Sequence, residues 1–254
     1  MPKGWAMGGR LDELSLRAIR TAAALPCSDA RTIARRLYGY GAVPRGPKFD
    51  LDFGPGDDGL AVLGLTSGGG VRARLARDYD ATTYPGWLGF GRLGGKDDAS
   101  SAFKLYASPR PEALATAFPV LAQVLADLDV RAFKVGRGPA GLLRPDKIVA
   151  YFASLDHLRI VAAALARKLA GCPAQGVPFT AGIDADGLLS WGIDPPSPAD
   201  GPAQSWRSWI TCRLAEAILA VRRPGLDPAG AVLARMAAEG VENWLPAARG
   251  KGRR

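Results

Sequence analysis

Lysine and tyrosine side chains recur inside short apolar stretches in the middle of the chain. The sequence reads Phe-Lys-Leu-Tyr at residues 103–106 and Phe-Lys-Val at residues 133–135. Successive side chains of a β-strand point to opposite faces, so Lys104 and Tyr106 would share one face and Lys134 would point away from its apolar neighbours. If the two strands are adjacent, these polar groups converge on one surface. Such a surface suits an anion, most simply a phosphate or a carboxylate.

These residue types can compose a β-elimination. A lysine acts as a base when desolvation or nearby cations lower its pKa, and Lys134 would have Lys104 and Arg144 as such neighbours. The guanidinium of Arg144 offers a fixed fork to a phosphoryl group, and the phenol of Tyr106 can protonate a departing oxygen. Together they would convert a phosphorylated Ser or Thr into a dehydroamino acid and release phosphate, without cofactor or metal.

The same pattern also fits a purely structural role. Lys104, Lys134 and Lys147 could be solvated residues on the outer face of a half-exposed sheet. Arg144 and Asp146 flank a proline and could form a β-turn with a surface ion pair. Local periodicity alone favours this structural interpretation and does not decide the matter.

Composition excludes several other classes of protein. The 254 residues are 48% apolar and 22% charged, as in ordinary globular proteins, and no apolar run approaches the roughly 20 residues that cross a bilayer. The only histidine, His157, rules out a His-rich metal site and is expected to face solvent in mid-helix. Three widely spaced cysteines predict free thiols and a cytoplasmic, reducing compartment. No P-loop, Rossmann or nucleophile-elbow motif is present.

The net charge of +9 raises the alternative of nucleic-acid binding. Four of the cations lie in residues 249–254, and the others are interspersed with acids. No helix-turn-helix, zinc-finger or RNA-binding motif stands out. A modest basic excess fits an acidic substrate equally well, so nucleic acid is the weaker alternative.

Apolar periodicity predicts an α+β fold with a small mixed or antiparallel sheet packed by helices. The expected helices cover residues 11–25, 29–38, 111–127, 155–170, 203–221 and 227–239. The expected strands cover residues 60–65, 101–107, 130–136, 147–153 and 188–191. Residues 78–100 are rich in glycine and aromatic residues and are predicted as a long loop.

The order of short motifs from residue 103 to about residue 217 resembles a known family. The motifs are, in order, Phe103-Lys104-Leu105-Tyr106, Phe133-Lys134-Val135, Arg144-Pro145-Asp146, Ile148-Val149-Ala150-Tyr151, Pro178-Phe179-Thr180, Gly187-Leu188, Ser205-Trp206 and Leu214-Ala215-Glu216-Ala217. They resemble the Hop A-like type III effectors of plant pathogens, whose homologues are stand-alone lyases in class V lanthipeptide gene clusters. Each motif is short, but their shared order covers somewhat under half of the chain.

The resemblance implies a distant relation to phosphothreonine lyases and to the lyase domains of class III lanthipeptide synthetases. Lys134 would then remove the α-proton. Lys104 would sit beside the leaving phosphate, with Tyr106 where the phosphothreonine lyases place a histidine acid. Arg144 would bind phosphate, and Tyr151 would line the pocket.

One position departs from the family pattern. The family carries an arginine shortly after its Ser-aromatic pair, where this chain has Ile210. Arg207 or Arg213 is expected to substitute for it. A member that had lost a phosphate-binding group would be a catalytically silent protein that binds a peptide or phosphopeptide.

The resemblance also implies partners and a division of the chain. The substrate would be a phosphorylated peptide or protein, which requires a kinase that makes it, and export as an effector stays open. No membrane partner is expected. The predicted parts are an N-terminal helical and loop-rich part that is a candidate lid (1–100), an α+β lyase-like core (101–248) and a basic disordered tail (249–254).

Overall fold

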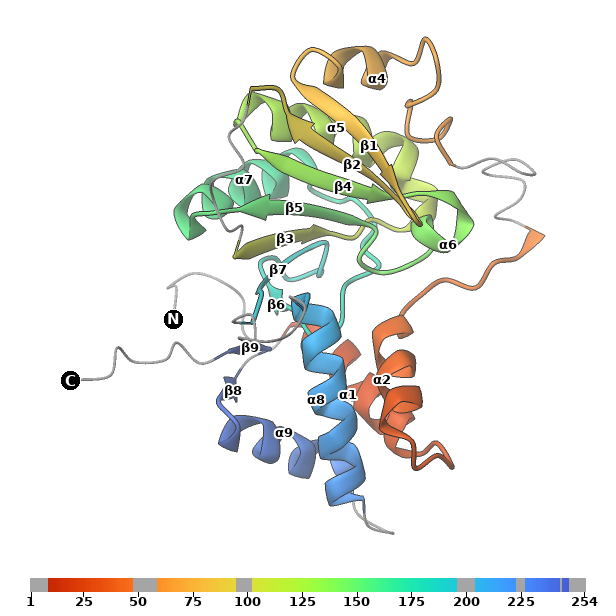
Figure 1. Ribbon diagram of the computed structural model, residues 1–254, viewed down its shortest axis with the longest axis vertical. Coiled ribbons are helices and arrows are strands. Elements are labelled where there is room, and N and C mark those ends of the chain that lie inside the picture. Colours follow the sequence, from red (N-terminus) through yellow and green to blue (C-terminus); the bar gives the residue numbers. More distant parts are fainter. Residues whose placement is uncertain are drawn as a thin grey trace, which may run out of the picture.

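The protein combines one large antiparallel sheet, covered by helices on one face, with a second group of helices beside the sheet (Figure 1). The computed structural model describes residues 9–47, 59–94, 102–195, 204–222, 227–242 and 244–246. This architecture confirms the α+β class predicted from the sequence. The tail at residues 249–254 lies outside the described residues.

Seven strands form the main sheet, in the order β1-β2-β4-β5-β3-β7-β6. They are β1 (Tyr79–Tyr84), β2 (Trp87–Arg92), β3 (Phe103–Ala107), β4 (Ala132–Gly136), β5 (Ile148–Phe152), β6 (Ala181–Gly182) and β7 (Leu189–Ile193). Every pair of neighbours in it is antiparallel. The two lysine-bearing strands, β3 and β4, are therefore not adjacent, because β5 lies between them.

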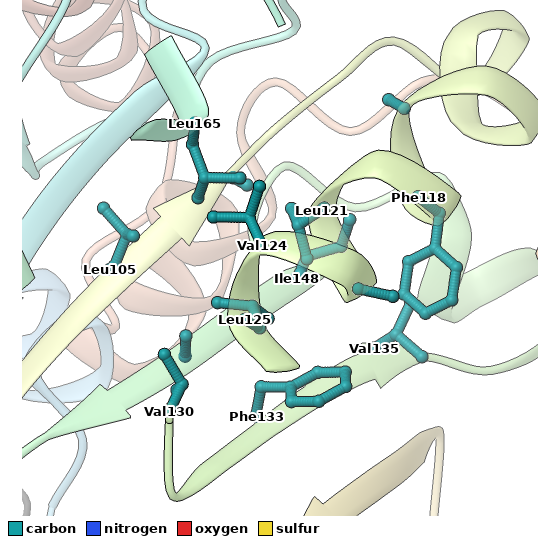
Figure 2. Packing of buried hydrophobic residues seen from close by; sticks show 14 of the residues in the cluster. Leu105, Phe118, Leu121, Val124, Leu125, Val130, Phe133, Val135, Ile148 and Leu165 are labelled. Atoms are coloured by element: carbon teal, nitrogen blue, oxygen red, sulfur yellow. The ribbon is translucent and has the colours of Figure 1, made fainter. Parts of the chain in front are cut away.

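One face of this sheet is covered by α5 (Leu114–Asp127) and α7 (Leu155–Lys168). Alternate strand residues point into this core, and Figure 2 shows Phe133 and Val135 of β4 packed beside Phe118 of α5. All three side chains are buried. Burying a side chain of this size contributes about 1.5–3 kcal/mol, so the core firmly fixes which face each lysine occupies. Shorter helical segments border the sheet: α4 (Gly70–Leu75), η1 (Pro111–Ala113) and α6 (Gly138–Leu142).

A second core joins helices from the two ends of the chain. It contains α1 (Arg10–Ala23), α2 (Ala30–Gly39), α8 (Trp206–Val221) and α9 (Pro228–Ala238). Trp206 is fully buried in it, and its indole Nε1 donates to the carbonyl of Phe179 at 2.7 Å. A two-stranded sheet of β8 (Val241–Glu242) and β9 (Leu245–Pro246) follows α9. None of the helices in the described ranges has the length and apolar character needed to cross a membrane.

Two sequence-based predictions of local structure are wrong. Residues 79–92 form the β1–β2 hairpin rather than a loop, with Pro85 and Gly86 as its two-residue connection. Gly86 adopts a φ of +75°, which glycine does at little steric cost. Residues 60–65 form turns instead of a strand, with Gly64 at a φ of +66°. A short apolar run does not by itself distinguish a strand from other buried segments.

His157 also differs from its prediction. The ring is half-buried rather than solvent-facing, and its Nε2 lies 2.6 Å from the carbonyl oxygen of Leu128. Its edge packs against the Phe152 ring, with centroids 5.3 Å apart. The histidine thus joins the end of α5 to α7 and has a structural role.

Candidate active site

The second face of the sheet, opposite α5 and α7, carries the residues singled out in the sequence. The strand registers place Lys104 of β3 opposite Tyr151 of β5, and Lys134 of β4 opposite Gly89 of β2. Tyr106 shares the face of Lys104 because it lies two residues further along β3. The cations therefore converge as expected, although β5 separates their strands.

Lys134 is held between two aromatic rings. Its Nζ lies 4.1 Å from the centre of the Trp87 ring and 5.8 Å from that of Tyr151. Burial, followed by the positive charge of Lys104, lowers the pKa of Lys134 to about 8. Arg144 adds to this effect, whereas nearby carboxylates oppose it. Within the described ranges Lys134 has no ion-pair partner, so a usable fraction of neutral amine exists near pH 8.

Lys104 is a paired cation beside the same tyrosine. Its Nζ forms an ion pair of 2.5 Å with Asp194, which directly follows β7, and lies 5.5 Å from the centre of the Tyr151 ring. Tyr106 is only 3% exposed, and burial raises the pKa of its phenol well above 10. The phenol thus stays protonated throughout the physiological pH range. In this form it can donate its proton but cannot act as a base.

Arg144 is fixed in place by a buried carboxylate. Its Nε donates to Asp146 at 2.5 Å, and its Nη2 donates to Asp146 at 3.0 Å and to the Tyr38 hydroxyl at 2.8 Å. The guanidinium carbon lies 4.5 Å from the centre of the Trp87 ring. Burial acts to raise the pKa of Asp146, but the charges of Arg207 and Arg144 outweigh it and hold that pKa well below its usual range.

Of the two arginines expected to replace the missing family arginine, the structure brings only Arg207 to this cluster. Arg207 is 2% exposed, its Nη1 lies 2.9 Å from Asp146, and its Nη2 donates to the backbone carbonyl of Tyr38 at 2.7 Å. The Nη1 contact is an ion pair without hydrogen-bond geometry. Arg213 lies on another side of α8, with a 47% exposed side chain 3.8 Å from Glu239.

A cleft of about 550 Å³ opens in front of Lys134. Tyr84, Trp87 and Tyr151 line it with aromatic rings, and Gly89 and Gly91 of β2 contribute to the same lining. A cavity of this size accommodates a small ligand or a short peptide segment. In the described part of the chain no three His, Cys, Asp or Glu side chains form a metal-binding group.

Sequence reasoning missed four residues that shape the site: Trp87, Tyr38, Asp146 and Asp194. Trp87 lies in the stretch predicted as a loop, and only the Pro-Gly step before it indicated a hairpin. Tyr38 comes from α2, over a hundred residues from the Arg144 that it binds. The structural alternative placed Asp146 in a surface pair, but it is buried between two guanidinium groups.

Comparison with known proteins identifies the fold. No family model and no curated protein matches the sequence. An effector protein from Pseudomonas syringae pathovar tomato matches at a TM-score of 0.54 and 13% identity, over 95% of this chain and 98% of its own. A second, from pathovar syringae, matches at 0.51 and 14%, over 95% and 100%.

A Shigella flexneri type III effector and phosphothreonine lyase, OspF, aligns with half of this chain and 78% of its own, at a TM-score of 0.40 and 12% identity. The two Pseudomonas matches each span nearly the whole of both chains. The chain therefore has the fold of the Pseudomonas syringae effector proteins, as the order of its sequence motifs predicts.

Proposed function

We propose that the protein is a cofactor-independent lyase that eliminates phosphate from phosphoserine or phosphothreonine in a peptide or protein. The observation that carries the proposal is the proximity of Lys134, a lysine of lowered pKa, to two further cations, Lys104 and Arg144. A base and a phosphate-binding group are needed side by side for this reaction.

The reaction divides between these groups. The neutral amine of Lys134 takes the α-proton, and the electrons of the Cα–H bond form the Cα=Cβ double bond. The Cβ–O bond breaks and its electrons leave with the phosphate. Lys104 and the guanidinium of Arg144 neutralise the charge of the departing dianion, and Tyr106 donates a proton to the bridging oxygen. The products are a dehydroamino acid and hydrogen phosphate.

The rings and the carboxylates have supporting roles in this proposal. Trp87 and Tyr151 exclude water from Lys134, which keeps its pKa low. Asp146 and Arg207 orient Arg144 from behind. The phosphorylated substrate must be supplied by a kinase. The motif resemblance fits a ribosomal peptide precursor, as in lanthipeptide biosynthesis, or a protein target.

The test is mass spectrometry of phosphoserine and phosphothreonine peptides incubated with the protein in chelator, without nucleotide. We expect the peptide to lose the mass of phosphoric acid, and Lys134→Ala to abolish the loss while the protein stays folded. Lys168→Ala, an exposed lysine on α7, is the matched control and should retain activity. Loss of only an HPO3 group would indicate hydrolysis and overturn the mechanism.

A second candidate function is a catalytically silent phosphopeptide- or peptide-binding protein. Two observations favour it: Lys104 and Arg144 already neutralise carboxylates, and Ile210 stands where the family has an arginine. In that case the phosphopeptide binds to the wild-type protein, Arg144→Ala weakens binding, and no dehydrated product forms with any peptide.

A further inference from the structure

The cleft extends from Lys134 across the sheet toward its edge strand. In one row of the register, Lys134 lies beside Gly89, which lies beside Thr82. In the next row, Ala132 lies beside Gly91, which lies beside Asp80. All six residues line the cleft. The cleft is thus a trough that leads from the proposed catalytic lysine to an acidic residue on β1.

A glycine keeps the floor of this trough open at one position. A Cβ atom at Gly91 would meet no atom within 4 Å, so any larger side chain there would project into the open trough. At Gly89 a Cβ atom would come within 2.8 Å of the Tyr84 ring, which lies over this position. Glycine inside a strand weakens it and often marks a place where another chain approaches closely. Gly91 therefore marks the open part of the trough, whereas Gly89 makes room for the ring of Tyr84.

The two ends of the trough have opposite charge. Lys134 lines one end, where the positive charges of Lys104 and Arg144 act on it. Asp80 lies exposed at the other end, where it has no ion-pair partner in the part of the chain that the structure describes. Arg92 also borders that end, but it is engaged by Asp129 at 2.6 Å and Asp78 at 3.8 Å.

Strand geometry gives the distance between these ends. Asp80 is two strands and two residues away from Lys134 in the register. With strands about 4.8 Å apart and a rise of about 3.3 Å per residue, the separation is about 12 Å. An extended peptide covers that distance in about three or four residues.

From this we infer that the trough binds the segment of substrate that flanks the phosphorylated residue, with Asp80 pairing with a Lys or Arg side chain three or four residues away. The inference rests on the proposed function for the position of the phosphorylated residue at Lys134. The substrate is then a phosphopeptide with a basic flanking residue. The open floor at Gly91 leaves room for its extended backbone.

The test compares labelled phosphothreonine peptides that carry Lys or Glu at the third and fourth positions on either side, all other residues being identical. Dissociation constants are measured by fluorescence anisotropy on the full chain with Lys134→Ala, so that no turnover occurs. We expect the Lys peptide to bind about threefold to fivefold more tightly at one of these positions, as for an exposed ion pair. Asp80→Lys should invert this preference.

Asp156→Lys provides the control, because it makes the same charge change on an exposed acid of α7, on the other side of the sheet. It should leave the preference for the Lys peptide intact. Gly91→Leu should weaken binding of every peptide by tenfold or more, with its fold checked by circular dichroism. An unchanged preference in Asp80→Lys overturns the inference whatever Gly91→Leu does.

Failure of the inference can be told apart from failure of the proposed function. If the wild-type protein eliminates phosphate but binds Lys and Glu peptides equally, the trough is not the flanking-residue site. If the preference exists and inverts in Asp80→Lys, but no peptide is ever dehydrated, the lyase proposal fails and the trough remains a phosphopeptide site.

Discussion

The ammonium group of Lys134 lies 4.1 Å from the centre of the Trp87 ring, across the boundary between β4 and β2. The ring has two opposed effects. It attracts the cation, which is worth about 0.5–1 kcal/mol at exposed sites, and it shields the amine from water. Burial is the largest influence on the pKa of Lys134, which falls from 10.5 to about 8.

The first prediction concerns the pH dependence of elimination. Only the neutral amine of Lys134 accepts a proton, so kcat/KM should rise tenfold per pH unit below about pH 8 and level off above it. The profile should be recorded above pH 7, because the phosphate group itself titrates near pH 6. A rate that is flat between pH 7 and 9 would remove Lys134 from the role of base.

The second prediction concerns Trp87→Ala. Removing the ring admits water to Lys134, so the pKa of the lysine should return toward 10.5, and the limb of the kcat/KM profile should move to higher pH by roughly one unit. The plateau at high pH should be less affected than the rate at pH 7. A limb that moves to lower pH would show that the attraction between ring and cation outweighs shielding.

The third prediction compares two aspartates. Asp146→Asn leaves the guanidinium groups of Arg207 and Arg144 without their buried counter-charge, which costs about 3–5 kcal/mol of unfolding free energy. Asp227→Asn breaks the exposed pair with Arg20 and should cost much less, because asparagine can still cap α9. Urea denaturation of both variants measures the difference, and equal losses would contradict the buried role of Asp146.

The faces of the lysine strands could be predicted from the sequence because a period of two is a local property. Phe133 and Val135 need burial, and this fixes where Lys134 points. The order of the strands could not be predicted in the same way. The register of Lys104 with Tyr151 depends on β5 lying between β3 and β4, which is a property of the whole sheet.

The hairpin and the buried carboxylate were missed for different physical reasons. Glycines at alternate positions of β2 hide the apolar alternation by which a strand is recognised, although Trp87 and Phe90 point to opposite faces. Asp146 is two residues from Arg144, so the sequence allows a local ion pair between them. Its burial comes from Arg207 and Tyr38, whose helices pack against this loop only in the folded chain.

The fourth prediction concerns Tyr106→Phe. The variant keeps the ring that packs against Val149 and Val177 and removes only the hydroxyl, so the fold should persist. Loss of a proton donor typically costs about 10²-fold or more in rate, and the loss should fall on kcat rather than on peptide affinity. Because burial holds the pKa of Tyr106 well above 10, the limb of the pH profile near pH 8 should stay in place. Wild-type kcat in this variant would assign the donor role to another group.

The fifth prediction concerns Lys147, which is 0% exposed and donates to the carbonyl of Pro109 at 2.8 Å and to Gln175 at 2.6 Å. Burial lowers its pKa to about 7, against about 10.4 in an unfolded chain. Between these values the unfolded state binds more protons, so the free energy of unfolding should rise with pH, by up to about 1.4 kcal/mol per unit.

Lys147→Met isolates this contribution. It removes the titration of Lys147 and leaves that of Lys134, whose lowered pKa acts in the same direction, so the difference between the two proteins belongs to Lys147 alone. The orphaned acceptors on Pro109 and Gln175 destabilise the variant by an amount that does not vary with pH. Urea denaturation from pH 6 to 9.5 should therefore show that, above about pH 7, the free energy of unfolding of the wild type rises relative to that of the variant. Parallel curves would mean that Lys147 keeps an ordinary pKa and stays charged in the core.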